Sequence, residues 1–241
     1  MKEPKSEVYL TDCMDIMKNY PDGYFDISIT DPPYGINAPN MQMGHAPNRK
    51  GKGQYPGESV AVKLRKGRLN GGSGKLKNRA LNIMNCEWDY HKPTAEYFKE
   101  LFRVSKNQII WGGNYFIEHL YNSRCIICWD KLQPWDNFSQ WEMAWTSFDM
   151  PAKIYRISNT GGANAEIKIH PTQKPVELYD CIYRDFVKDG MKIFDSHLGS
   201  GSHRITAYKK GIDFFACEID KDYYEAQEKR FKIFKSQLRL F

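Results

Sequence analysis

Residues 192–202 read Lys-Ile-Phe-Asp-Ser-His-Leu-Gly-Ser-Gly-Ser, and residues 214–218 read Phe-Phe-Ala-Cys-Glu. An apolar run, a glycine-rich turn, a segment of helical spacing and a second apolar run that ends in an acid predict a β-α-β unit. The glycines allow the backbone to approach a ligand, and Glu218 at the strand end is placed to accept hydrogen bonds from both hydroxyls of a ribose. The stretch therefore predicts a nucleoside site in an α/β domain.

This turn differs from the loops that cradle phosphates. Arg204 stands where a dinucleotide-binding turn has its third glycine, and no Gly-Lys-Ser/Thr sequence follows. A phosphate-binding loop for a dinucleotide or for ATP therefore fits poorly. A tight strand-to-helix turn that binds no ligand is the alternative interpretation.

Short apolar runs alternate with segments of helical spacing along the rest of the chain. Strands are predicted over residues 8–10, 25–30, 108–111, 124–129, 141–147, 192–194 and 214–217, and helices over 12–19, 94–105, 175–187, 202–210 and 222–238. Strands that alternate with helical crossovers predict a doubly wound, mainly parallel sheet of the α/β class. Residues 150–168 read as polar and irregular, and no linker divides residues 1–241 into two domains.

The composition of the 241 residues is typical of a globular chain, with 41% hydrophobic and 27% charged residues. No run of eighteen apolar residues predicts a membrane span, and the first ten residues lack the apolar region of a secretory signal. The six cysteines are spread along the chain and are expected to be reduced thiols in a cytoplasmic protein. Disordered, collagen-like, secreted and membrane classes are therefore disfavoured.

Positive charge is concentrated in one stretch of the chain. Of 35 Lys and Arg residues, ten fall between residues 45 and 79, where Glu58 is the single acid. Many glycines and few large apolar residues predict a mobile insertion over about residues 38–88. A basic arm of this kind suits a polyphosphate, because neutralising phosphates needs no precise pocket. A solvated linker without a partner is the alternative.

Asp31-Pro32-Pro33-Tyr34 directly follows the predicted strand 25–30. Two prolines fix φ and remove two backbone donors, which makes a rigid turn and leaves the carbonyls of Asp31 and Pro32 free to point outward. The carboxyl end of a strand is where open α/β sheets bind ligands. A carboxylate, carbonyl acceptors and an aromatic face together suit a planar group with an exocyclic amine. A Pro-Pro pair that only stiffens a loop is the alternative.

His170-Pro-Thr-Gln-Lys174-Pro175 opens the predicted helix 175–187. Backbone N–H groups at the helix start, together with the Lys174 cation, could hold a small carboxylate. Taken alone, the segment favours a capped helix start with a solvated lysine.

Together these blocks resemble the β-group of amino-directed DNA methyltransferases, which use S-adenosyl-L-methionine. In that family a D-P-P-Y block comes first, an H-P-T-x-K-P block follows, and a D-P-F-x-G-S-G turn lies near the end. Residues 31–34, 170–175 and 195–202 resemble these blocks and occur in that order. Residues 11–13 resemble the family's G-D-C block, and residues 210–224 its second strand and following helix. The resemblance implies a Rossmann-like methyltransferase fold with a seven-stranded sheet and a circularly permuted motif order.

The resemblance also implies a role for each matching residue. The residues that would grip the target base are Asp31, Pro32, Pro33 and Tyr34. The residues that would bind the cofactor are Asp12, Cys13, Asp31, Thr172, Lys174, Asp195, His197, Gly199, Ser200, Gly201, Ser202, Glu218 and Ile219. Ser196 and His197 depart from the family pattern, which has Pro and Phe there. The basic insertion would contact DNA through Arg49, Lys50, Lys52, Lys63, Arg65, Lys66 and Arg68.

A mechanism follows from these residue types. Acceptors at Asp31 and the Pro32 carbonyl would draw the protons of an aromatic amine, so that its nitrogen lone pair can attack a methyl group in line. A base inside a duplex cannot reach such a pocket, so it must be flipped out, with Tyr34 replacing its lost stacking. No Pro-Cys pair supplies the thiol of cytosine-C5 chemistry.

Several further patterns are interpreted mainly as structural. Cys125 and Cys128 have CxxC spacing inside an apolar run, and His197 and His203 lack carboxylate partners at ligand spacing, so no metal site is predicted. The tryptophans expected to pack in the core or in loops are Trp129, Trp135, Trp141 and Trp145, of which Trp135 is the best candidate to face DNA. The residues 111–115, Trp-Gly-Gly-Asn-Tyr, are expected to shape the base pocket, with two glycines that allow close approach.

The expected activity is methylation of an exocyclic amine of DNA. Asp at position 31 favours adenine N6 over cytosine N4, which stays as the alternative. A nucleic-acid-binding protein without catalysis, and methylation of RNA or of a glutamine side chain, also stay open. A small target-recognition segment is expected at about residues 148–169, with a short or relaxed recognition sequence. DNA is the expected partner, a restriction endonuclease and a homodimer stay open, and no membrane is expected.

Overall fold

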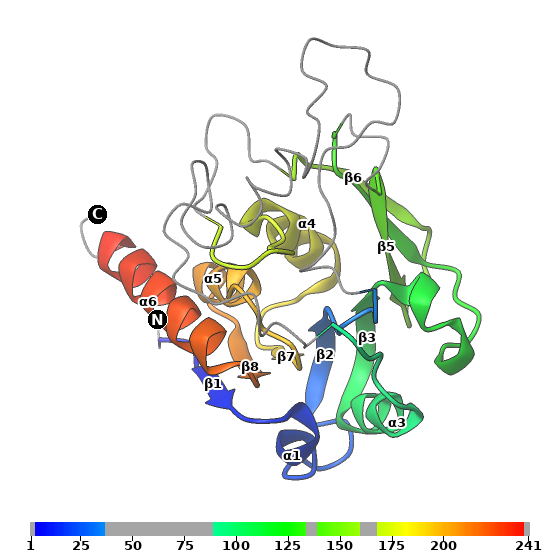
Figure 1. The fold of residues 1–241 in the computed structure, drawn as a ribbon, viewed down its shortest axis with the longest axis horizontal. Coiled ribbons are helices and arrows are strands. Elements are labelled where there is room, and N and C mark those ends of the chain that lie inside the picture. Colours follow the sequence, from blue (N-terminus) through cyan, green and yellow to red (C-terminus); the bar gives the residue numbers. More distant parts are fainter. Residues whose placement is uncertain (1–2, 37–88, 134–138, 160–167, 239–241) are drawn as a thin grey trace, which may run out of the picture.

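The computed structural model describes residues 3–36, 89–133, 139–159 and 168–238. These residues form one eight-stranded sheet in the order β1-β8-β7-β2-β3-β5-β4-β6, with helices on both sides (Figure 1). The strands are β1 (Ser6–Leu10), β2 (Phe25–Thr30), β3 (Ser105–Trp111), β4 (Ile126–Asp130), β5 (Trp141–Thr146), β6 (Lys153–Arg156), β7 (Lys192–Asp195) and β8 (Asp213–Glu218). The α-helices are α1 (Cys13–Met17), α3 (Ala95–Val104), α4 (Val176–Phe186), α5 (Ser202–Lys209) and α6 (Lys221–Leu238), and the 3-10 helices are η3 (Gly113–Tyr115) and η4 (Ile117–His119).

Helices cover both faces of the central strands. On one face, α1 and α3 pack against the sheet, with Leu101 of α3 in the same buried cluster as Phe25 of β2. On the other face, α4 and α5 pack against the sheet, with Leu178 of α4 clustered with Ile193 of β7. Strands β2, β7 and β8 are buried along most of their length, which explains their nearly continuous apolar runs. Among the helices of the described ranges, none has both the length and the apolar character needed to cross a membrane.

Strand direction places the ends of many strands at one edge of the sheet. The pairings that join β1, β8, β7, β2 and β3 are all parallel. Strand β5 is antiparallel to both β3 and β4, so β5 begins and β4 ends at the edge where β3 ends. We call this edge the carboxyl edge of the sheet. The predicted doubly wound, mainly parallel architecture is thereby confirmed.

The sheet has one strand more than the seven predicted. Strand β6 lies within residues 150–168, predicted to be irregular, and pairs in parallel with β4. Its four residues, Lys-Ile-Tyr-Arg, do not alternate between apolar and polar and so lack the pattern that identifies a strand from sequence. The strand is held by its pairing and by Tyr155, which is buried and donates from its hydroxyl to Asp185 of α4 at 2.7 Å. The predicted recognition segment 148–169 therefore contributes a strand to the sheet, and its residues 160–167 lie outside the described ranges.

Strand β7 comes from the last third of the chain but lies between β8 and β2, near the middle of the sheet. Its register aligns Ile193 with Ile27 and Phe194 with Ser28 of β2. The glycine turn after β7 therefore lies beside the proline turn after β2. This arrangement agrees with the permuted motif order implied by the family resemblance.

Candidate active site

Sequence blocks that are far apart in the chain meet at the carboxyl edge. The residues that end the strands there or follow them within two positions are Asp12 after β1, Glu218 of β8, Asp195 of β7, Asp31 after β2 and Trp111 of β3. Thr30 Oγ1 lies 2.5 Å from Ser196 Oγ, which joins the base of the proline turn directly to the base of the glycine turn. Tyr34, in the turn after β2, and Glu218, at the end of β8, therefore lie at the same edge of the sheet.

The turn formed by Asp31 to Tyr34 is fixed by hydrogen bonds at both ends. Asp89 Oδ1 accepts from the backbone N–H of Tyr34 at 2.7 Å. The Tyr34 hydroxyl donates to Asp31 Oδ1 at 2.5 Å. Pro32 is buried, whereas Pro33 is partly exposed. The turn thus presents a carboxylate and an aromatic ring side by side.

The ring of Tyr34 occupies space that a glycine leaves free. Gly112 adopts φ of +70°, and a Cβ built there would lie 2.2 Å from Tyr34 Cε1. Tyr34 also stacks on Tyr115 with 4.8 Å between ring centroids and 16° between planes. A Cβ at Gly113 would in turn lie 2.6 Å from the Cβ of Trp145. The predicted close approach at residues 111–115 is therefore confirmed, and the approaching group is the tyrosine of the proline turn.

Glu218 is held by backbone donors of the glycine turn and of the residues that follow β8. Its Oε2 accepts from Gly199 N at 2.8 Å, and its Oε1 accepts from Asp220 N at 2.9 Å. Gly199 and Gly201 have φ of +56° and +73°, which favours glycine at both positions. Burial raises the pKa of Glu218 to about 7, although the two backbone donors oppose that shift. The carboxylate is thus preset at the strand end, and it is half protonated near neutral pH.

The departure from the family pattern at residues 196 and 197 builds a polar cluster. Ser196 Oγ lies within hydrogen-bond distance of Thr30 Oγ1, of the Tyr97 hydroxyl at 2.7 Å and of His197 Nδ1 at 2.8 Å. Burial lowers the pKa of His197 to about 4, against the charges of Asp195 and Asp12. His197 is therefore a neutral imidazole at physiological pH, beside the glycine turn.

Asp195 points into the core and pairs with His203. Its Oδ2 lies 2.9 Å from His203 Nδ1, and its Oδ1 accepts from His197 N at 3.1 Å. The other ring nitrogen of His203 lies 3.0 Å from the Tyr183 hydroxyl. His203, for which the sequence shows no carboxylate at metal-ligand spacing, thus has Asp195 as a partner, because α5 turns it back toward the end of β7. In the described parts of the chain, no three His, Cys, Asp or Glu side chains gather as a metal site.

Lys174 is buried, and it joins a cluster of charges at the carboxyl edge. Its side chain is 4% exposed, and its Nζ pairs with Asp31 Oδ2 and lies 3.2 Å from Glu142 Oε2. Glu142 Oε1 pairs in turn with Lys131 Nζ. The interpretation of Lys174 as a solvated lysine is therefore wrong. Glu142 and Lys131 were not singled out from sequence, although a glutamate inside an aromatic strand is an available signal.

The segment before α4 reaches both the proline turn and the glycine turn. His170 lies beside Gly199, whose Cβ would be 3.5 Å from the histidine Cδ2. Thr172 contacts the same ring, with its Oγ1 3.1 Å from His170 Nδ1. Because Lys174 reaches Asp31, this one segment bridges the two turns that the sequence predicts as functional.

Asp12 and Cys13 lie on the far side of Glu218, at the start of α1. Asp12 Oδ1 caps the helix by accepting from Met14 N at 2.7 Å. The backbone of the preceding residue, Thr11, donates from its N–H to Glu218 O at 3.0 Å. Burial, reinforced by the charge of Asp12, raises the pKa of the Cys13 thiol to about 12. The thiol is therefore protonated and unreactive at neutral pH.

The remaining predicted cofactor residues differ in their surroundings. Ser200 and Ser202 are buried, their hydroxyls lie 3.2 Å apart, and Arg230 of α6 donates to Ser200 O at 2.7 Å and Ser202 Oγ at 3.0 Å. Ile219 instead is 62% exposed, directly after Glu218. The two serines thus fasten the turn to α6, whereas Ile219 offers an apolar side chain at the surface.

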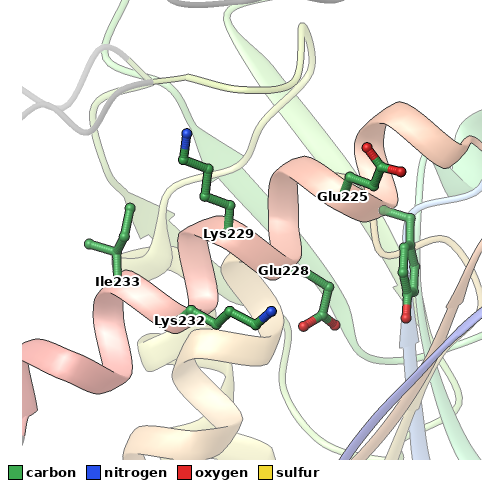
Figure 2. A pocket seen from close by; sticks show the side chains of 6 residues that line it. Glu225, Glu228, Lys229, Lys232 and Ile233 are labelled. Atoms are coloured by element: carbon green, nitrogen blue, oxygen red, sulfur yellow. The ribbon is translucent and has the colours of Figure 1, made fainter.

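Some predictions fall elsewhere. The predicted DNA-contacting residues between 49 and 68, and Trp135, lie outside the described ranges. Trp141 is 50% exposed, so its predicted packing in the core or in a loop is wrong. It begins β5, opposite Asp130 at the end of β4. Figure 2 shows a hollow whose six lining residues all belong to α6. That hollow shares no residue with the carboxyl edge.

Comparison with known proteins shows the family. The family described as DNA methylase, of N6 and N4 methyltransferases, matches residues 25–229. The Type II methyltransferase M2.DpnII of Streptococcus pneumoniae is 25% identical over 158 residues, which cover 64% of this chain and 53% of the relative, so the chain spans about half the length of that relative.

Two solved structures share the fold at 13% identity each. PvuII DNA methyltransferase, described as cytosine-N4-specific, has a TM-score of 0.57 and covers 95% of this chain and 87% of its own. TTHA0409 of Thermus thermophilus, solved in complex with S-adenosyl-L-methionine, has a TM-score of 0.52 and covers 95% and 93%. With a family match over most of its length, the chain belongs to the N6/N4 DNA methylase family.

Proposed function

We propose that the protein transfers a methyl group from S-adenosyl-L-methionine to the exocyclic amine of a flipped DNA base, with adenine N6 as the first candidate. The observation that carries the proposal is the contact between the two turns at the carboxyl edge. Thr30 and Ser196 meet at 2.5 Å, so the acid at Asp31 lies next to the glycine turn that Glu218 braces. A donor and an acceptor held this way need little rearrangement to react, which supplies much of the rate.

The residues of the glycine turn fit the cofactor. Gly199 and Gly201 adopt the positive φ that shapes the turn around the strand end, and the Glu218 carboxylate suits the two ribose hydroxyls. Asp12 and Cys13 border Glu218 and would face the adenine ring edge. His197 would contribute a neutral ring. Thr172 would receive the carboxylate together with Lys174, whose ammonium group the cofactor would share with Asp31 and Glu142. When bound, S-adenosyl-L-methionine supplies an electrophilic methyl group.

The proline turn fits the base. Asp31 Oδ1 and the Pro32 carbonyl would accept the two amine protons, while Tyr34 stacks on the base ring beside Tyr115. Drawing those protons favours a pyramidal nitrogen, whose lone pair is then available to the methyl group. Asp31 here is a hydrogen-bond and proton acceptor, so no covalent enzyme intermediate is required.

The identity of the base is the finer part of the proposal. An aspartate at position 31 favours adenine, and cytosine N4 is the alternative, because PvuII DNA methyltransferase shares the fold and is described as cytosine-N4-specific. Incubation of the protein with duplex DNA and methyl-labelled cofactor, followed by digestion to nucleosides, separates N6-methyl-2′-deoxyadenosine from N4-methyl-2′-deoxycytidine. Label in neither product, under conditions where DNA is bound, would support a binding protein without catalysis.

Partners and setting follow from the same proposal. Residues 1–241 would act as one methyltransferase domain on DNA in the cytoplasm, with the basic insertion supplying affinity. M2.DpnII is a Type II methyltransferase, so a restriction endonuclease partner is proposed on that likeness. Sedimentation with and without duplex DNA would show whether the protein acts as a monomer or as a homodimer.

A further inference from the structure

Four charged side chains form a chain of contacts at the carboxyl edge. Asp31 follows β2, Lys174 precedes α4, Glu142 lies on β5 and Lys131 directly follows β4. Lys174 pairs with Asp31 on one side and lies 3.2 Å from Glu142 on the other, as an ion pair without the alignment of a hydrogen bond. Glu142 pairs through its other oxygen with Lys131. Two carboxylates and two ammonium groups therefore alternate, and their formal charges cancel.

The cluster is shielded from water, so each charge depends on the others. The side chains of Lys174 and Lys131 are 4% and 10% exposed, and those of Asp31 and Glu142 are 20% and 22% exposed. Lys174 Nζ also lies 5.1 Å from the ring centroid of Trp111. Charges in such surroundings are stable only when paired, and removing one partner leaves the next uncompensated. Glu142 therefore acts on Asp31 through Lys174.

We propose that Glu142 is a positioning residue for methyl transfer: it shares the Lys174 ammonium with Asp31, is itself neutralised by Lys131, and so keeps Asp31 a good acceptor for the protons of the target amine. The proposal rests on the proposed function, in which Asp31 accepts those protons. Without Glu142, Lys174 would be held by Asp31 alone, and the bound ammonium would compete with the amine for the carboxylate. The role belongs to a residue outside every block that the sequence predicts.

The electrostatics of the cluster agree with this division of roles. Burial raises the pKa of Asp31, Lys174 opposes that shift, and the charge of Glu142 adds to it. The two lysines hold the pKa of Glu142 below its usual value despite its burial. The tyrosines that face the carboxylates, Tyr34 and Tyr179, have pKa values well above the usual value and remain neutral. Asp31 is therefore the more basic of the two carboxylates because Glu142 carries the charge.

Two charge-removing substitutions, Glu142→Gln and Lys131→Met, test the proposal because they should shift the pKa of Asp31 in opposite directions. In Glu142→Gln, loss of the negative charge should lower the pKa of Asp31, move the acid limb of the kcat profile down by about one pH unit and reduce kcat about tenfold at pH 8. KM for DNA should change less than about threefold. In Lys131→Met, loss of the positive charge should move the acid limb up. The double variant should return the acid limb toward that of the parent protein, because one charge of each sign is gone.

A direct titration separates this inference from the proposed function. Aspartate labelled with 13C at Cγ, with the Asp31 signal assigned by its loss in Asp31→Asn, reports ionisation whether or not methyl transfer occurs. A lower Asp31 pKa in Glu142→Gln and a higher one in Lys131→Met support the inference even if no base is methylated. An unchanged Asp31 titration in both variants, with native circular dichroism spectra, overturns it. Glu142→Asp, which keeps the charge, should behave more like the parent protein than Glu142→Gln does, and the reverse order also overturns the inference.

Discussion

The two halves of the carboxyl edge differ in which part of the chain organises them, the backbone in one half and side chains in the other. The half at β1, β8 and β7 is organised by backbone: a glycine turn at positive φ, in which Gly199 N–H donates to Glu218. The half at β2, β3 and β5 is organised by side chains, in which Asp31 is surrounded by Tyr34, Lys174 and Glu142. A backbone site is specified by a few consecutive residues, whereas a side-chain site depends on partners contributed by several strands. We therefore expect the first to tolerate substitution of its neighbours better than the second.

The largest expected effect comes from the side-chain half. Replacing Asp31 with Ala removes the acceptor for the amine protons, and kcat should fall between about 100-fold and 10,000-fold. The affinity for S-adenosyl-L-methionine, measured by calorimetry, should change only a few-fold, because Glu218 and the glycine turn are intact. Substantial methyl transfer by this variant would show that the two halves do not divide the work as described.

Gly112→Ala should disturb the side-chain half through packing, beyond the backbone strain that any alanine meets at a positive φ. The added Cβ would lie 2.2 Å from the Tyr34 ring, which must move, and displacement of a substrate-positioning group by an ångström costs about 100-fold in rate. Gly190→Ala is the matched control: its φ of +81° imposes similar backbone strain of about 1–2 kcal/mol, with no atom within 4 Å of the new Cβ. Equal losses of kcat in both variants would mean that strain, rather than the Tyr34 contact, is responsible.

The backbone half should respond to pH through Glu218. Because its pKa is about 7, the ionised fraction of Glu218 falls about tenfold between pH 8 and pH 6. The dissociation constant for S-adenosyl-L-methionine should therefore be about tenfold higher at pH 6 than at pH 8. Glu218→Gln should bind weakly at both values. Isothermal titration at a series of pH values measures the effect, and a flat profile in the parent protein would contradict the role of the ionised acid.

Ionisation of Glu218, which should favour cofactor binding, should lower the free energy of unfolding. The pKa of Glu218 is raised from 4.5, so the folded chain binds more protons than the unfolded chain between about pH 4.5 and 7. The contribution of this group to the free energy of unfolding is complete below pH 4.5 and is lost as pH rises through about 7, a change on the order of 3 kcal/mol. Urea titrations of the ligand-free protein should show that Glu218→Gln reduces this pH dependence.

The smallest expected effect lies at the junction of the two halves. Ser196→Ala removes a hydroxyl within hydrogen-bond distance of Thr30, Tyr97 and His197. Leaving these buried groups short of a partner should lower the free energy of unfolding by about 1–3 kcal/mol. Chemical denaturation would measure that loss, and a variant as stable as the parent protein would mean that the cluster does not bind the two turns together.

Local signals predicted the backbone half and most of the fold. The glycines at 199 and 201 and the acid at 218 belong to one local β-α-β unit, so the sequence pattern places them at one edge of the sheet. The helix start at Asp12 is equally local, because its capping side chain bonds within two residues. Apolar runs long enough to cross the core, as in β2, were likewise predicted with their bounds.

Long-range contacts limited what could be predicted of the rest. Strand β6 is held by its pairing with β4. The sequence of its four residues, two apolar residues between two charged ones, does not predict that pairing. Glu142 and Lys174 lie 32 positions apart, and no spacing rule relates a strand residue to the residue before a helix. The departure from the family pattern at Ser196 and His197 is visible in the sequence. The hydroxyl groups that Ser196 contacts, however, come from Thr30 of β2 and Tyr97 of α3. In each case the determining neighbour is supplied by tertiary structure.

The position of β7 has a consequence for how the protein is made. Strand β1 pairs only with β8 among the described strands, and β2 meets its second neighbour only when β7 is present. A chain emerging from the ribosome therefore lacks part of its sheet until β7 and β8, at residues 192–218, have been synthesised. Such late, nonlocal closure slows folding and leaves open strand edges exposed meanwhile. Nascent chains stalled before residue 192 should accordingly be sensitive to protease and recruit chaperones, and release of the full chain should end both.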